Sequence, residues 1–334
     1  MRYEISRVQW SDSKVPLPGG GRFGLRCIAG EGKLFMIDIH TLDLNFMGYS
    51  QLIASFLVPC PGDGFVLFET GPASTLETLE SEIAKAGFQL ENLKGIFPTH
   101  VHLDHSAGAG SLAVRTGAPV FVHPKGELHL VDPEEKLLPS AKRLYGDMMT
   151  PLWGTVEPVP KELVVVVQDG DTVDLNGLEI GAHHTPGHAV HHIAWQIGGA
   201  VAMGDVGGVR FPDATHVLPP MPPPDIDVDL WLHSLERIRA VEPELLLLTH
   251  FGAFDDVGRH LDELEARLTR WLDVAQRTLA ADDDGSTVAE AILALDEAEM
   301  AESTVLPGAV ERYRKLCPMD ANAAGLERYC RRTG

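Results

Sequence analysis

Metal-ligand side chains crowd the segment His100-Val-His-Leu-Asp-His105, which holds three histidines and one aspartate. Alternate residues of an extended segment point the same way, so His100 and His102 can grip one ion together. Asp104 and His105 follow at the expected turn into a helix and face a neighbouring position. Imidazole and carboxylate ligands suit zinc, iron, manganese or nickel, so ligand type does not fix the metal. This spacing predicts a metal site rather than a polar loop with satisfied histidines.

The elements around this segment are suited to present it. A short apolar stretch, Gly95–Pro98, predicts a strand that runs directly into the histidines. Small residues in 106–110 would let the following helix, Ser106–Thr116, start close to the ions. Further along, the apolar run Leu245–Leu248 ends at Thr249-His250, which is the pattern of a buried strand that delivers a residue at its tip.

The rest of the chain alternates between short strands and helices. Ile53–Val58 and Phe65–Glu69 read as strands joined by a turn at 61–64, and a capping box at 74–77 predicts a helix ending at Gly87. Further strands are expected at Val120–His123, Leu163–Val167, Glu179–His183, Ile193–Ile197 and Ala200–Gly204. Helices and loops are expected over 124–162, a stiff proline-rich loop over 206–229, and helices over Leu230–Val241, from Val257 onward and within 286–334.

Four motifs together resemble the metallo-β-lactamase superfamily. Thr99-His-Val-His-Leu-Asp-His105 resembles its HxHxDH signature. Thr185-Pro-Gly-His188, Met203-Gly-Asp205 and Leu248-Thr-His250 then resemble later family motifs, in the family's order. The resemblance implies one metal site from His100, His102 and His188, a second from Asp104, His105 and His250, and Asp205 shared between them. It covers about residues 25–272 and implies an α/β, four-layer αββα sandwich with metals at one rim of the two sheets.

Three segments follow from this resemblance. They are an N-terminal arm over 1–24, a catalytic domain over 25–272, and a helical extension over 273–334 that packs on the domain or on a partner subunit. Glu69 stands where the family usually has an aspartate that supports the ligands. Two roles remain open for it: support of a metal ligand, or capping of the turn that follows its strand.

The charge balance of such a site indicates a hydrolase. Two divalent ions bring about +4, and two aspartates and a bridging hydroxide reduce this to about +1, which stabilises a developing oxyanion and lowers the pKa of water. The hydroxide would attack a polarised carbonyl or phosphoryl group, and Asp104 would orient it and pass its proton to the leaving group. We expect two divalent ions, zinc before iron or manganese.

The substrate is less well defined. Similarity to glyoxalase II-like thioesterases and acyl-homoserine lactone hydrolases favours a small ester, thioester or lactone, within an uncharacterised subgroup. Alternatives are an oxidoreductase similar to the mononuclear iron persulfide dioxygenases, a small-molecule phosphodiesterase, and a non-catalytic binding module. Candidate substrate contacts are Arg210 and His216 in the loop after Asp205, and His192 beside His188.

Composition limits the partners. The 334 residues carry 48 acidic and 27 basic side chains, a net charge of −21, which disfavours binding to nucleic acid or to anionic membranes. The four cysteines form no CxxC pair, and neither a signal peptide nor a membrane-spanning run is recognisable, so we expect a cytoplasmic protein with reduced thiols. A small-molecule substrate is expected, and a homodimer is one possible assembly.

Overall fold

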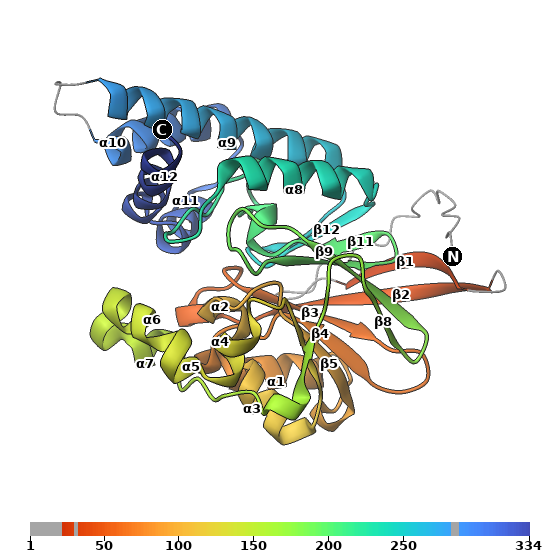
Figure 1. Ribbon diagram of the computed structural model, residues 1–334. Helices are drawn as coiled ribbons and strands as arrows, with labels where there is room; N and C mark the ends of the chain where they lie inside the picture. Colours follow the sequence, from red (N-terminus) through yellow and green to blue (C-terminus); the bar gives the residue numbers. More distant parts are fainter. Residues whose placement is uncertain (1–21, 30–32, 282–286) are drawn as a thin grey trace.

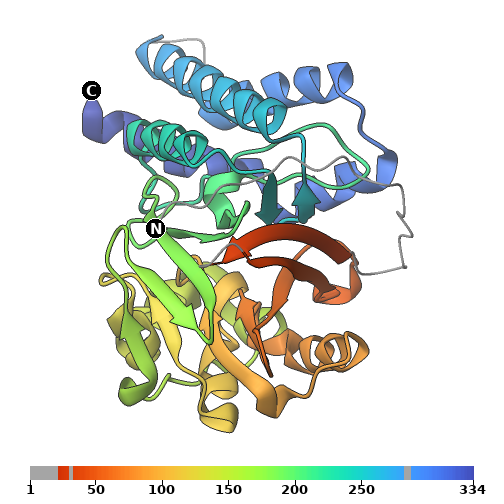
Figure 2. The same ribbon diagram turned by 90° about the vertical axis from the view of Figure 1, so that its right-hand side faces the viewer.

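The computed structural model describes residues 22–29, 33–281 and 287–334. Two β-sheets face each other, and helices cover the outer face of each sheet (Figure 1). Helices α8 (Val228–Ala240) and α9 (Val257–Ala280) lie over one sheet, while α1 (Leu76–Lys85) and α3 (Ala109–Thr116) lie over the other. The view turned by 90° shows the same layers from the side (Figure 2). This arrangement confirms the predicted αββα sandwich.

The first sheet has seven strands in the order β1-β2-β3-β4-β5-β6-β7. Their bounds are β1 (Arg22–Ala29), β2 (Lys33–Asp43), β3 (Ala54–Pro59), β4 (Phe65–Phe68), β5 (Leu93–Phe97), β6 (Val120–Val122) and β7 (Val164–Val166). Pairing is antiparallel from β1 to β4 and parallel from β4 to β7. The parallel half sends the carboxyl ends of β4 and β5 to the same edge, where the histidine motif begins.

The second sheet has six strands in the order β13-β12-β11-β10-β9-β8. Their bounds are β8 (Thr172–Leu175), β9 (Leu178–His184), β10 (Ile193–Ile197), β11 (Ala200–Ala202), β12 (Leu245–Leu248) and β13 (Gly252–Phe254). All pairs are antiparallel except β11 with β12. Because β11 and β12 run in parallel, the turns that follow them, which carry Asp205 and His250, leave the sheet at the same edge.

Aromatic side chains join the two sheets beneath the histidine motif. Phe97 of β5 stacks on Phe121 with ring centroids 4.4 Å apart. Trp195 of β10 meets the Phe97 ring edge-on at 5.1 Å and donates its indole N–H to the Pro98 carbonyl at 3.0 Å. Both Phe97 and Trp195 are fully buried. Burial of this apolar surface fixes the spacing of the sheets next to the residues that must converge.

Short helices link β6 to β7, and longer ones close the chain. The short helices between β6 and β7 are α4 (Glu127–Val131), α5 (Pro133–Lys136), α6 (Leu138–Tyr145) and α7 (Met149–Trp153). The helices at the end of the chain are α10 (Val288–Glu302), α11 (Pro307–Leu316) and α12 (Met319–Thr333). The predicted boundary at residue 272 falls inside α9. The buried Leu261, Leu264 and Leu268 of this helix belong to the same hydrophobic core as the strands, so the helical extension is continuous with the sandwich.

Some local expectations differ from the structure. The capping box at 74–77 does not form, because Ser74 donates its hydroxyl to the Leu152 carbonyl and α1 begins only at Leu76, after a turn of 3-10 helix. Strands β8 and β13 were not predicted, since each is short and β8 is half exposed. Residues 1–21 of the predicted arm lie outside the described residues, and Arg22–Ala29 is already a strand.

Two further findings concern the cysteines and the membrane. Cys60, Cys317 and Cys330 are buried and free of disulfides. Among the helices in the described ranges, none combines the length and the apolar character that a bilayer crossing demands.

Candidate metal centre

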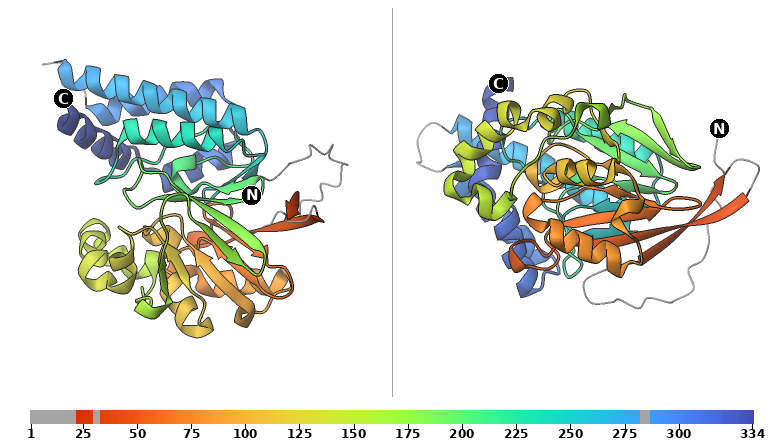
Figure 3. Two further views of the ribbon diagram at one scale, coloured as in Figure 1. Left: turned by 45° about the vertical axis from the view of Figure 1, so that its right-hand side comes forward. Right: turned by 90° about the horizontal axis from the view of Figure 1, so that it is seen from below.

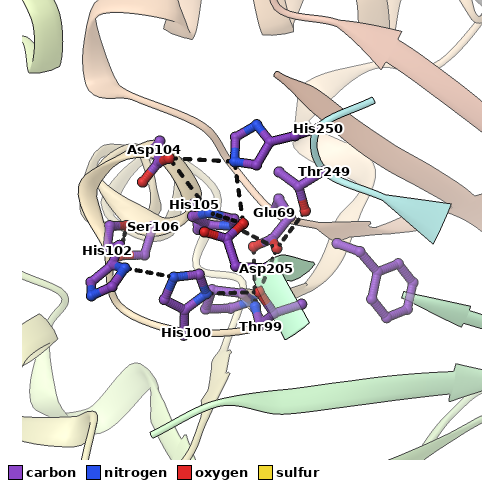
Figure 4. A network of polar contacts seen from close by, with 12 residues as sticks. Glu69, Thr99, His100, His102, Asp104, His105, Ser106, Asp205, Thr249 and His250 are labelled. Atoms are coloured by element: carbon purple, nitrogen blue, oxygen red, sulfur yellow. Dashed lines mark hydrogen bonds and ion pairs between the residues drawn. The ribbon is translucent and has the colours of Figure 1, made fainter. Parts of the chain in front are cut away.

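The edge shared by the two sheets gathers all seven predicted ligands. His100 and His102 follow β5, and Asp104 and His105 lie in the first turn of α2 (Leu103–Ser106). His188 lies between β9 and β10, Asp205 follows β11 and His250 follows β12. Figure 4 shows the side chains of His100, His102, Asp104, His105, Asp205 and His250 gathered at one place. Figures 1 and 3 place α6, α7 and the C-terminal helices on the same side of the molecule, beyond α2.

Three overlapping groups of side chains could hold a metal ion. We call His100, His102 and His188 site one, and Asp104, His105 and His250 site two; the third group, His100, His105 and Asp205, lies across both. In site one, His102 Nδ1 lies 2.9 Å from His100 Nε2 and 3.0 Å from His188 Nε2. In site two, Asp104 Oδ2 lies 3.6 Å from His105 Nε2 and 3.5 Å from His250 Nε2. The ligand atoms within each group lie within 4.8 Å of one another.

Asp205 lies between the two sites. Its Oδ2 is 3.2 Å from His188 Nε2 of site one. Its Oδ1 is 3.2 Å from both His105 Nε2 and His250 Nε2 of site two. One carboxylate therefore turns one oxygen toward each group.

The buried polar atoms fit bound cations. His105 Nε2 and Asp205 Oδ1 are inaccessible to solvent and make no hydrogen bond of acceptable geometry. An unpaired buried polar atom costs free energy comparable to a lost hydrogen bond, or more when it is charged. Metal coordination would satisfy both atoms, and three imidazoles or two imidazoles and a carboxylate are ordinary ligand sets for a divalent transition metal.

The outer ring nitrogens of the ligands have fixed partners. His188 Nδ1 lies 2.9 Å from the Pro220 carbonyl oxygen, and His250 Nδ1 lies 2.9 Å from the Leu52 carbonyl oxygen. His105 Nδ1 lies 2.9 Å from Glu69 Oε1. Because these partners accept hydrogen bonds, each ring in its neutral form would carry its proton on Nδ1 and could offer Nε2 to a metal in a fixed orientation.

The contacts of Glu69 favour support of the candidate ligands over capping of the turn, the two roles left open by the sequence. Besides His105, its carboxylate accepts hydrogen bonds from the Thr99 backbone N–H at 3.0 Å, the Thr99 hydroxyl at 2.6 Å and the Thr249 hydroxyl at 3.1 Å. Glu69 is fully buried and has a positive φ of 63°. The longer side chain of glutamate therefore still reaches the ligand shell from the end of β4.

Opposite charges in the centre shift the pKa values of its groups. Burial would raise the pKa of Asp104, but His105 and a hydrogen bond with His250 lower it to about 2. Burial would lower the pKa of His250, but Asp205 and Asp104 raise it to about 9. Burial and the neighbouring His188 lower the pKa of His102 to about 3. The carboxylates are thus ionised at neutral pH and favour positive charge between them.

One face of the centre is open. The Asp104 side chain is 22% exposed, whereas that of Asp205 is 7% exposed and those of His105 and His188 are fully buried. His102 is likewise only partly buried. A substrate would therefore approach across His102 and Asp104.

The three predicted substrate contacts have structural partners instead. The Arg210 guanidinium forms an ion pair with Asp256 at 2.7 Å and stacks on a phenylalanine ring. His216 is fully buried and bonds Asp296 of α10 at 2.9 Å. His192, also fully buried, bonds the Thr185 hydroxyl at 2.8 Å, beneath the ligands. These contacts favour roles in holding the loop and the ligand shell over contact with substrate.

Several supporting residues carried no sequence signal. Leu52 and Pro220 act through backbone carbonyls, so their residue types reveal nothing. Thr99 and Thr249 each directly precede a ligand histidine, and this placement beside His100 and His250 is the one hint that the sequence offered.

Comparison with known proteins agrees with this geometry. A model of the metallo-beta-lactamase superfamily matches residues 52–250, more than half of the chain. A metallo-beta-lactamase fold-containing protein of Sulfurisphaera tokodaii is 28% identical over 202 residues, which is 60% of this chain and 73% of that relative. A hydroxyacylglutathione hydrolase of Maricaulis maris is 25% identical over 201 residues, covering 56% of this chain and 61% of the hydrolase, less than two thirds of its length.

A solved structure extends the likeness of the fold over nearly the whole chain. The metallo-beta-lactamase family protein of Thermus thermophilus superposes with a TM-score of 0.60 at 21% identity, over 95% of this chain and 94% of that chain. The chain therefore belongs to the metallo-beta-lactamase superfamily. It is an enzyme of the metal-dependent hydrolase class.

Proposed function

We propose that the protein is a dinuclear hydrolase that cleaves a small ester, thioester or lactone. The position of Asp205 carries this proposal. Its two oxygens lie 3.2 Å from ligand nitrogens of site one and site two respectively. A complete second ligand group, bridged to the first, favours two ions over the single iron of a persulfide-dioxygenase-like enzyme.

The side chains have separable roles in this reaction. Site one and site two would each hold one divalent ion, and zinc suits their imidazole and carboxylate ligands. Ions bound there would polarise a substrate carbonyl and lower the pKa of water toward neutrality. Asp104, ionised and partly exposed, would orient the attacking water, accept its proton on the carboxylate and pass it to the leaving group.

The choice of an acyl substrate rests on the relative named as a hydroxyacylglutathione hydrolase. Glutathione itself receives less support. Lys142, a basic residue suited to a peptide carboxylate, is exposed on α6 and pairs with Glu134 at 3.0 Å. A smaller or less anionic thioester, or a lactone, therefore fits better. The free buried cysteines are consistent with a cytoplasmic enzyme, which we include in the proposal.

Metal analysis followed by a substrate panel tests the proposal. We expect two zinc ions per chain by elemental analysis, and turnover of at least one thioester, lactone or carboxyl ester. One iron per chain with oxygen consumption would contradict the hydrolase assignment. Turnover of phosphodiesters alone would retain the dinuclear centre but replace the acyl substrate.

A double variant tests the residues. His102→Ala combined with Asp104→Ala removes one ligand from each site and the proposed proton acceptor, so turnover should fall by at least about 10²-fold to 10⁴-fold. The control is Asp63→Ala, which changes an exposed aspartate in the turn between β3 and β4. Full activity in the double variant would refute the mechanism.

A further inference from the structure

The loop over 208–226 is fastened to the C-terminal helices. His216 bonds Asp296 of α10 through its Nε2, and its carbonyl accepts the Tyr313 hydroxyl of α11. The buried Arg267 of α9 donates to the Val217 carbonyl. The loop begins just after Asp205, so these contacts bring helices from outside the family match to the border of the metal centre.

One peptide group in this loop connects a metal ligand to α12. The Pro220 carbonyl oxygen lies 2.9 Å from His188 Nδ1. The Met221 N–H, at the other end of the same peptide bond, donates to Asn322 Oδ1 of α12 at 2.8 Å. A peptide group is planar and rigid, so a bond that holds its N–H also sets the direction of its carbonyl. Hydrogen bonds in such a chain also polarise one another.

The contact with α12 is close and buried. Asn322 is 2% exposed, and its Nδ2 makes no hydrogen bond, so the amide serves as an acceptor. One helical turn further, Gly325 packs against the carbonyl of Met221. A Cβ on Gly325 would lie 1.9 Å from that oxygen, so the loop approaches α12 as closely as a glycine allows.

We propose that Asn322 is a positioning residue for the metal ligand His188, acting through the Pro220–Met221 peptide. The C-terminal extension thereby completes the ligand shell of site one. The histidines of site two have no such link to the C-terminal helices. The Nδ1 atom of His105 bonds Glu69, and that of His250 bonds the Leu52 carbonyl, and both partners belong to the half of the sandwich built on the first sheet. The inference rests on the same metal centre as the proposed function, but it concerns metal affinity and not turnover.

Two substitutions of similar size separate positioning from simple filling of space. Asn322→Leu removes the acceptor, whereas Asn322→Asp keeps an oxygen for the Met221 N–H. We expect the first to weaken one of two zinc binding constants about tenfold, the lower end of the effect of outer ligand partners on metal affinity. The second should stay within about threefold of the wild-type constant. Competition against a chromophoric chelator measures both constants on the full chain.

Gly325→Ala provides a second route if Asn322→Leu does not fold. Alanine favours a helix, so a purely local role for Gly325 predicts equal or greater stability. If the added methyl group instead displaces the loop, zinc affinity at one site should fall by about as much as in Asn322→Leu. Gly308→Ala is the matched control, since its Cβ would meet only the tip of Arg312, at 3.7 Å.

The outcomes divide cleanly. The proposal is supported if zinc affinity at one site falls in Asn322→Leu and Gly325→Ala but is retained in Asn322→Asp and Gly308→Ala. Unchanged constants in folded Asn322→Leu and Gly325→Ala, equal weakening of both sites, or equal loss in Asn322→Asp would overturn it. Absence of turnover with intact constants would count against the proposed function alone.

Discussion

Glu69 contacts three residues of the candidate metal centre at once. Its carboxylate accepts from His105, from Thr99 beside His100 and from Thr249 beside His250. The contacts reach both sheets, since Thr249 follows β12 and Thr99 follows β5. A carboxylate is needed here because every neighbouring group is a donor, and the negative charge also raises the basicity of the His105 ring.

Glu69→Gln tests this role at the scale of one residue. Glutamine offers one acceptor oxygen where glutamate has two, and its amide would face a donor such as the Thr99 N–H. We expect the zinc constant of site two to weaken about 10-fold to 100-fold, measured by chelator competition. Glu80→Gln is the matched control, because Glu80 pairs with Arg115 on the surface. If the zinc binding constant of site two is the same in Glu69→Gln as in Glu80→Gln, then Glu69 does not support the site.

The candidate ligands could be predicted from the sequence because they are side chains that stand in recognisable motifs, several of them at strand ends. His100, Asp205 and His250 all follow apolar runs, and the resemblance added their order. The supports were less accessible to sequence reasoning. A backbone carbonyl such as that of Pro220 has no residue-type signature, and the partner of His216 lies 80 residues away on α10. Pairings over such separations arise only from the packed structure.

At the scale of elements, the strength of the apolar signal decided what could be predicted. β12 was predicted to the residue because Leu245–Leu248 is an unbroken buried run, and β10 because its apolar stretch is compact. β8 has only four residues and alternates between exposed and half-buried positions, so its pattern is weak. The helical pattern expected from Val257 onward was correct, yet it did not show that one helix, α9, continues past residue 272 into the helical extension.

Helices α9 and α10 share a carboxylate that tests their packing. Glu299 of α10 accepts from Arg267 Nε at 2.6 Å and from Arg270 Nε at 2.5 Å. The Arg267 side chain is 2% exposed, whereas that of Arg270 is 47% exposed. Arg267→Ala leaves the buried Val217 carbonyl without its donor and removes the buried partner of one Glu299 oxygen, so it should cost about 3–5 kcal/mol of unfolding free energy. Arg270→Ala should cost at most about 1 kcal/mol, because water already screens its pair.

Urea unfolding followed by circular dichroism measures both variants. The two variants share the residue type, the helix and the Glu299 acceptor, and they differ in burial and in the additional bond from Arg267 to the Val217 carbonyl. Similar losses in the two variants would mean that the Arg267 contact does not hold α10 against α9.

At the scale of the whole molecule, the metal centre joins the two halves of the sandwich. Glu69 and His100 to His105 follow strands of the first sheet, and His188, Asp205 and His250 follow strands of the second. Ions bound between them would therefore link the sheets at one rim, and site one would also depend on α12 through the 208–226 loop. The net charge of −21 adds a general preference for bound cations.

Metal removal should consequently lower global stability without changing the fold. Free metal at about a hundredfold excess over Kd stabilises a single site by about 2.7 kcal/mol, so the thermal midpoint should rise by several degrees with added zinc. The far-UV spectrum of the metal-free protein should stay native, because His105, His188 and His250 are already held by Glu69, Pro220 and Leu52. Asp205→Asn removes the charge of the carboxylate between the two sites, so in this variant added zinc should raise the thermal midpoint much less. A midpoint that does not respond to zinc, or a metal-free chain that unfolds, would contradict a centre whose ligands the protein itself holds in place.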